Sequence, residues 1–267
     1  MNVLFFGDVV GEIGLEALEQ HLPRLKKALG ADFVIVNGEN TCKGSGLTYK
    51  EYRRLLALGV DCVTLGNHYH GRDQIDDYIE EAEQLVRPLN LPTYFLGSGS
   101  LTFDLGDTSI QVVNLLGQAF MKEEVDSPFE ALEDALDPEA SVRIVDFHAD
   151  STSEKKMLLE AFKGRVSAVI GTHTHVQTAD PCIIEGSGFL TDVGYCGMQD
   201  GIIGYRPDSI LDALLYKKGN RFAIAEDGPA EIDCVLLRID PLTGKCSSVE
   251  PMRFLDGKEF NHVTHHL

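Results

Sequence analysis

Short apolar runs rich in β-branched and aromatic residues alternate with segments of helical periodicity over the first two-thirds of the chain. Strands are predicted for residues 2–7, 32–37, 61–66, 141–148 and 165–172. Helices are predicted for residues 15–29, 48–59, around 73–86 and from 151 onward. Alternating strands and helices are typical of an α/β fold whose strands run largely parallel.

Capping residues, a glycine and a proline indicate where some of the predicted helices begin, end or bend. Leucines recur at helical spacing over residues 15–29, and Pro23 is expected to kink or restart that helix. Thr48 with Glu51 forms a capping box, and the helix that it opens is expected to end at Gly59. The sequence "STSE" at 151–154 caps a further helix in the same way.

The rest of the chain is richer in strands, chiefly over residues 93–116 and 187–254. No linker, internal repeat or low-complexity segment divides the sequence. We therefore expect one domain over residues 1–267, built on a large mixed sheet system with helices outside it.

Charge and composition indicate which binding partners are disfavoured and in which compartment the protein is expected to act. The formal charge is −19, from 23 basic against 42 acidic residues, and no basic run offsets it. Long nucleic-acid duplexes and anionic membranes are therefore poor partners. We expect no signal peptide, because no basic region precedes the first apolar run and Asp8 interrupts that run, and we expect no membrane span. The six cysteines form no CxxC pair. We expect reduced thiols and a cytoplasmic location, while homo-oligomer formation stays open.

Polar side chains with metal-binding chemistry follow the predicted strands, at the edge of an α/β sheet where ligands bind. They are Asp8, Glu39, Asn40, Asn67, His68, His148, His173 and His175. Imidazole, carboxylate and amide oxygen together suit divalent transition metals, and the absence of cysteine argues against a structural zinc site. The sequence thus predicts a hydrolytic metal centre.

The spacing of His173 and His175 favours two metals over one. Residues two apart in an extended strand point to the same side with Cα atoms about 6.6 Å apart. This is wide for one ion, but it suits two ions about 3.5–4 Å apart that each take one imidazole.

Each of these residues also has a simpler interpretation when it is taken alone. Asp8 could be a turn or N-cap residue, Glu39-Asn40 a surface turn, and His148 a buried histidine with ordinary hydrogen bonds. Four further histidines are expected to be solvated: His70, His262, His265 and His266. The joint placement of the first set at strand ends favours the metal hypothesis.

Five short motifs in this order resemble the calcineurin-like metallophosphoesterases, and most closely their YmdB-like branch of bacterial phosphodiesterases. The motifs are "GD" at 7–8, "NGEN" at 37–40, "GNH" at 66–68, "DFHAD" at 146–150 and "GTHTHVQTAD" at 171–180. The similarity extends through "TDVGYCG" at 191–197. It implies a two-sheet β-sandwich flanked by helices, a four-layer α/β/β/α fold.

The resemblance also implies a role for each residue. Asp8, Glu39, Asn40 and His175 would hold one metal, and Glu39, Asn67, His148 and His173 the other, with Glu39 as the bridge. His68 would be catalytic and not a ligand. The implied ions are iron or manganese, with zinc as an alternative. The implied reaction is hydrolysis of 2′,3′-cyclic nucleotides or related small phosphodiesters by a hydroxide that two metals activate.

One loop departs from the branch, which usually continues the Asn-His pair with Thr-Trp-Asp. Tyr69, His70 and Gly71 stand there in this chain, which has no tryptophan. We expect this loop to border the substrate and to affect its choice. Two alternatives stay open: a phosphomonoesterase such as a nucleotidase, and a regulatory metal-binding protein with vestigial activity.

Overall fold

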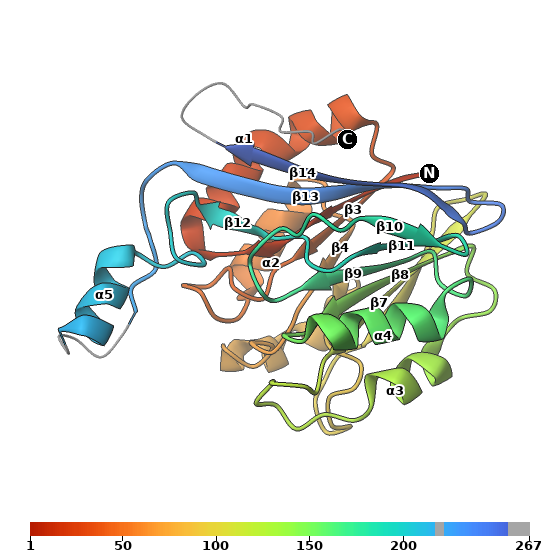
Figure 1. The fold of residues 1–267 in the computed structure, drawn as a ribbon, viewed down its shortest axis with the longest axis horizontal. Coiled ribbons are helices and arrows are strands. Elements are labelled where there is room, and N and C mark those ends of the chain that lie inside the picture. Colours follow the sequence, from red (N-terminus) through yellow and green to blue (C-terminus); the bar gives the residue numbers. More distant parts are fainter. Residues whose placement is uncertain (217–221, 256–267) are drawn as a thin grey trace.

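Two β-sheets pack face to face, and helices cover their outer faces in the computed structural model of the protein, which describes residues 1–216 and 222–255 (Figure 1). The helices are α1 (Gly11–Leu29), α2 (Tyr49–Ala57), α3 (Pro128–Ala135), α4 (Thr152–Phe162) and α5 (Pro207–Leu215), with 3₁₀ turns η1 (Asp73–Asp77) and η2 (Ile79–Glu81). Within these residues, no helix is long and apolar enough to cross a membrane.

The first sheet contains eight strands among the described residues. They are β1 (Asn2–Phe6), β2 (Asp8–Val9), β3 (Phe33–Asn37), β4 (Cys62–Thr64), β5 (Leu85–Val86), β12 (Tyr195–Met198), β13 (Ala230–Ile239) and β14 (Cys246–Leu255). Their order is β2-β12-β13-β1-β3-β4-β5, and β14 pairs with β13. Strands β1, β3, β4 and β5 are parallel, whereas β13 runs antiparallel to β1.

The second sheet has six strands in the described part of the chain, in the order β10-β11-β9-β8-β7-β6. They are β6 (Ser100–Asp104), β7 (Ser109–Leu116), β8 (Val142–His148), β9 (Ala168–Thr172), β10 (Cys182–Ile184) and β11 (Ser187–Leu190). The four central strands are parallel, and antiparallel strands β10 and β6 form the edges.

Successive side chains along each strand point to opposite faces of the sheet. The hydrophobic core therefore has three layers, one between the sheets and one under the helices on each side. On β1, Phe5 packs between the two sheets, while Phe6 points toward α1 and α2. On β8, Ile144 faces the other sheet, and Phe147 packs under α3 and α4. Because both faces of each sheet are buried, the predicted four-layer α/β/β/α sandwich is confirmed.

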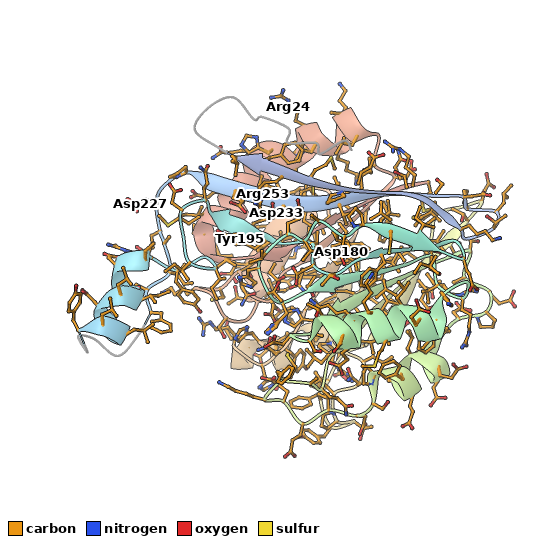
Figure 2. The ribbon with its side chains drawn as sticks, in the orientation of Figure 1. Arg24, Asp180, Tyr195, Asp227, Asp233 and Arg253 are labelled. Carbon is orange, nitrogen blue, oxygen red and sulfur yellow. The ribbon has the colours of Figure 1, made fainter. Side chains whose placement is uncertain are left out.

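A long antiparallel pair, β13 with β14, carries a partly buried ionic cluster. Arg253 on β14 donates to Asp233 on β13 at 2.9 Å, and the two residues lie close together in Figure 2. Glu231 lies 3.3 Å from the same guanidinium, and Asp233 also accepts a hydrogen bond from the backbone of Tyr195 at 3.4 Å. The cluster ties both strands to β12, which pairs with Asp8.

Several sequence predictions of local structure are correct. The helix over 48–59 appears as α2, where Glu51 accepts from the backbone N–H of Thr48 at 2.9 Å and Gly59 follows the last turn with φ of 85°. Ser151 caps α4 by accepting from the N–H of Glu154 at 3.3 Å.

Two predicted helices and one predicted strand region differ from the structure. Helix α1 runs unbroken through Pro23, whose exposed position lets water satisfy the carbonyl that the ring displaces. Residues 73–86 form two 3₁₀ turns and β5 in place of one helix, because an α-helix would stack acidic pairs such as Asp76 with Glu80 four residues apart. Residues 93–97 are turns and not a strand.

Candidate metal centre

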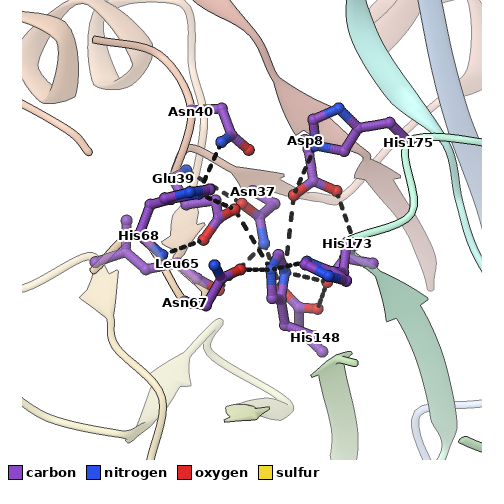
Figure 3. Close-up of polar contacts among 12 residues, drawn as sticks. Asp8, Asn37, Glu39, Asn40, Leu65, Asn67, His68, His148, His173 and His175 are labelled. Carbon is purple, nitrogen blue, oxygen red and sulfur yellow. Dashed lines mark hydrogen bonds and ion pairs between the residues drawn. The ribbon is translucent and has the colours of Figure 1, made fainter. Parts of the chain in front are cut away.

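Strands of the two sheets end at a common point, and the predicted ligands gather there (Figure 3). These residues are Asp8, Glu39, Asn40, Asn67, His68, His148, His173 and His175. Among them, Asp8, Glu39 and His148 are buried and offer ligand atoms that all lie within 4.8 Å of one another, so this group can hold a metal ion. All predicted site residues are therefore near one another, although Asp8 lies within β2 and not in a turn.

Three side chains converge on Nε2 of His148. Asn67 Oδ1 lies 2.9 Å from it, His173 Nδ1 lies 3.1 Å from it and Glu39 Oε1 lies 3.4 Å from it. Neighbouring ligands around one ion at bond lengths near 2.1 Å are separated by about 3.0–3.4 Å. These four side chains thus have the spacing of a single coordination shell.

A second group lies around Asp8. Its Oδ1 is 3.7 Å from His148 Nδ1 and 3.8 Å from His175 Nε2, which is too far for hydrogen bonds. Asn40 donates from Nδ2 to the carbonyl of Gly44 at 3.1 Å, so its Oδ1 is the remaining ligand atom. Asp8 Oδ1 and Asn40 Oδ1 are both buried without a hydrogen-bond partner among the described residues. Buried acceptors of this kind are rare, and a cation would satisfy them.

The charges of the site also favour a bound cation. Burial raises the pKa of Asp8. Burial also opposes ionisation of Glu39, but His148 and His68 outweigh it and hold the pKa of Glu39 well below its usual range. Burial opposes protonation of His148, but Glu39 and Asp8 raise its pKa to about 9. Burial and the neighbouring His148 lower the pKa of His173 to about 3, which keeps its lone pairs available. The two carboxylates thus favour a positive charge at this buried site, as the carboxylate ligands of a metal do.

Hydrogen bonds behind His148 orient its ring. Thr172 donates its hydroxyl proton to Asp146 at 2.7 Å, and His148 Nδ1 lies 2.9 Å from the hydroxyl oxygen of Thr172. Thr172 must therefore accept from Nδ1, and this leaves Nε2 facing the ligand cluster. Asn37 donates to the other oxygen of Asp146 at 3.2 Å and accepts from the backbone N–H of Glu39 at 3.1 Å, so it connects the two sheets at this point.

The geometry of His173 and His175 differs from the extended chain that the sequence suggested. Both have left-handed backbone, with φ of 100° and 59°. Tertiary contacts hold this conformation: Asp192 accepts from the backbone N–H of Thr174 at 3.0 Å, and the carbonyl of Ile203 lies 3.1 Å from Nδ1 of His175. Both imidazoles face the site, but the extended-strand reasoning that placed them there was wrong.

Asn67 and His68 lie in a turn, so they also depart from extended geometry. Both side chains face the cluster, and His68 Nδ1 lies 3.0 Å from Glu39 Oε1. The backbone N–H of His68 donates to Glu39 Oε2 at 2.9 Å. Gly66 permits this approach, because a Cβ there would lie 2.3 Å from the Glu39 carboxylate. The hydrogen bond to Glu39 raises the pKa of His68.

His70, which the sequence suggested to be solvated, lies outside the ligand cluster. His70 is exposed, and its Nε2 lies 2.9 Å from Asp76. The tail histidines 262, 265 and 266 lie outside the described part of the chain.

Four supporting residues were not singled out from the sequence. They are Asn37, Asp146, Thr172 and Asp192. Each one lies inside or beside a motif that was recognised, within three residues of a ligand or in "TDVGYCG". Asp192 is buried and pairs with Lys155 at 2.9 Å, a contact that only the tertiary structure reveals.

Comparisons with known proteins identify the family of this chain. The profile of the family described as YmdB-like protein matches residues 4–252. A 2′,3′-cyclic-nucleotide 2′-phosphodiesterase of Bacillus subtilis is 39% identical over 265 residues, covering 97% of this chain and 99% of the relative.

Solved structures extend the agreement to the fold. The crystal structure of a novel phosphatase of Mycoplasma pneumoniae superposes with a TM-score of 0.90 at 35% identity, covering 97% of this chain and 95% of that one. A hypothetical protein of Thermus thermophilus gives a TM-score of 0.89 at 38% identity, covering 96% of this chain and 100% of that one. With its matched length and shared architecture, this chain belongs to the YmdB-like protein family.

Proposed function

We propose that this protein is a metal-dependent phosphodiesterase that hydrolyses 2′,3′-cyclic nucleotides or related small phosphodiesters at the candidate metal centre. The observation that carries the proposal is the position of Glu39. Its carboxylate contacts His148 and His68 and lies next to Asp8 in one buried cluster. The name of the Bacillus subtilis relative supports the substrate class.

The two groups of contacts support the ligand sets that the family resemblance implies. Asp8, Glu39, Asn40 and His175 would hold one cation, and Glu39, Asn67, His148 and His173 would hold the other. Iron or manganese suits this mixture of nitrogen and oxygen donors, and zinc is the alternative. When bound, two such cations supply positive charge that neutralises the phosphoryl oxygens and activates water as the nucleophile.

His68 supplies the proton that the leaving oxygen needs. Its Nδ1 faces Glu39, which leaves Nε2 as the nitrogen that donates to the substrate. The hydrogen bond to Glu39 raises the pKa of His68, so more of the imidazole carries a proton near neutral pH.

The setting of the site is part of the proposal. One domain over residues 1–267 carries all ligands, and the formal charge of −19 favours a small ester over a long polyanion. All six cysteines are free thiols, as expected for a protein that acts in the cytoplasm.

A substrate panel with metal-loaded protein tests the proposed reaction. The panel contains a 2′,3′-cyclic nucleotide, a nitrophenyl phosphodiester and a nucleoside monophosphate, and the products are scored as ring-opened nucleotide or free phosphate. Ring opening that a chelator abolishes supports the proposal. Phosphate release from the monoester alone would establish a nucleotidase instead, and no turnover at any metal loading would favour a regulatory metal-binding protein.

A further inference from the structure

An aromatic cluster lies beside the turn that carries His68. We define this aromatic rim as His70, Tyr94 and Phe95. The rings of Tyr94 and Phe95 are 4.6 Å apart between centroids, and those of His70 and Phe95 are 5.6 Å apart. Tyr69 packs under the rim, edge-on to Phe95 at 5.5 Å.

The rim is anchored to the candidate metal centre through one turn. The N–H of Gly71 donates to the carbonyl of His68 at 2.8 Å, and the N–H of Tyr69 donates to the carbonyl of Gly66 at 3.0 Å. Tyr69 is buried, and its hydroxyl donates to the carbonyl of Leu96 at 2.9 Å, which fixes residues 94–96 against the turn. His70 thus stands two residues from His68, whose ring contacts Glu39.

The rim presents aromatic surface to solvent from a fixed backbone. Tyr94 is 76% exposed although its ring packs on Phe95. The guanidinium of Arg87, a buried residue, donates to the carbonyls of Phe95 and Leu96 at 3.3 and 3.0 Å. The carboxylate of Asp76 lies 2.9 Å from His70 Nε2, and this hydrogen bond restrains the imidazole ring. Exposed rings held in place in this way lose little conformational entropy when a ligand stacks on them.

We propose that the aromatic rim stacks on the nucleobase of the ester whose phosphate reaches the candidate metal centre. This inference rests on the proposed function, and it specifies the substrate as a nucleotide over a cyclic phosphate without a base. Stacking on aromatic side chains tolerates any base, because every base has a π-face. Recognition by stacking therefore predicts broad base tolerance, with purines ahead of pyrimidines because their stacking area is larger.

A pair of cyclic esters with and without a base tests the rim. Kinetics are measured on adenosine 2′,3′-cyclic phosphate and on glycerol 1,2-cyclic phosphate. We expect Tyr94→Ala to raise KM for the adenosine ester about tenfold and to leave the glycerol ester unchanged. Tyr94→Phe keeps the ring and should keep the wild-type KM. Tyr49→Ala is the matched control, because Tyr49 is 52% exposed on α2 and makes its ring contacts with Tyr52 and Tyr78, outside the rim. Equal changes on both esters, or none, would overturn the proposal.

Binding of a product nucleotide separates the rim from the reaction. Calorimetry of the metal-loaded protein compares adenosine 3′-monophosphate with inorganic phosphate. Weaker nucleotide binding in Tyr94→Ala, with unchanged phosphate binding, supports the rim even if no ester is hydrolysed, an outcome in which only the proposed function fails. Hydrolysis of both esters together with nucleotide affinity that is independent of Tyr94 would overturn the rim alone.

Discussion

Thr172 accepts a hydrogen bond from Nδ1 of His148 over 2.9 Å and so directs the other ring nitrogen toward Glu39. Thr172→Val keeps the shape of the side chain but removes this acceptor, and it should lower metal affinity about 10–100-fold. Metal analysis after competition with a graded chelator measures the loss. Thr174→Val is the control, because Thr174 is held through its backbone N–H, which valine retains. Equal affinity in both variants would show that Thr172 does not orient the ring.

Glu39→Gln should remove metal from both positions and abolish nearly all activity. The carboxylate is buried, contacts the ligand cluster of His148 and lies beside Asp8, so an amide would leave both cations without their shared charge. Elemental analysis and turnover are measured on the same preparation. Full metal content with normal turnover would mean that another residue bridges the ions.

About two transition-metal ions per chain should be found in untagged protein purified without chelator, since the two proposed ligand groups both include Glu39. Removal of the ions by a chelator should abolish turnover, and manganese or iron should restore it. A stoichiometry of one or less after reconstitution would contradict the dinuclear proposal.

His68→Ala should keep both metals and lose turnover on a 2′,3′-cyclic nucleotide. The backbone N–H that donates to Glu39 remains in the variant, so the carboxylate stays in place. A general acid contributes about 10²–10⁴-fold when the leaving alkoxide is poor. The loss on a nitrophenyl phosphodiester should therefore be much smaller. Loss of metal would make His68 a ligand, and equal loss on both esters would indicate a role in substrate binding.

Glu231→Gln should stabilise the protein above neutral pH. Burial, with the nearby Asp233 carboxylate, raises the pKa of Glu231 from 4.5 to about 7. The folded state therefore holds this proton longer than the unfolded state, and stability falls as pH rises from 4.5 through 7.

Urea unfolding at pH 5 and pH 8 measures this dependence. The variant should gain about 1–2 kcal/mol over wild type at pH 8, after allowance for solvent screening, and little at pH 5. Glu124→Gln, which changes an exposed carboxyl, is the control. A gain of equal size at both pH values would assign the effect to packing and not to titration.

The positions of most strands and the gathering of the candidate ligands at one place could be predicted because both follow local rules. Apolar runs define strands, and the residues that follow β3 and β4 must meet at one edge of a parallel sheet. The conformation of His175 could not be predicted, because the carbonyl of Ile203, 28 residues away, holds its ring. The prediction of a helix over residues 73–86 was wrong for a local reason: acidic residues four apart oppose a helix there.

The contact between Asp8 and the backbone of His173 joins residues 165 apart in sequence. The ligand cluster can form only once β2 lies next to the end of β9, a strand from the other sheet. Closure of so long a loop is entropically costly, and cations that bind only after this closure favour the finished molecule by mass action. Metal bound at the proposed centre would then stabilise the folded state of the whole chain. Resistance to proteases should rise with free metal concentration in both sheets together, and not only in the loops that supply the ligands.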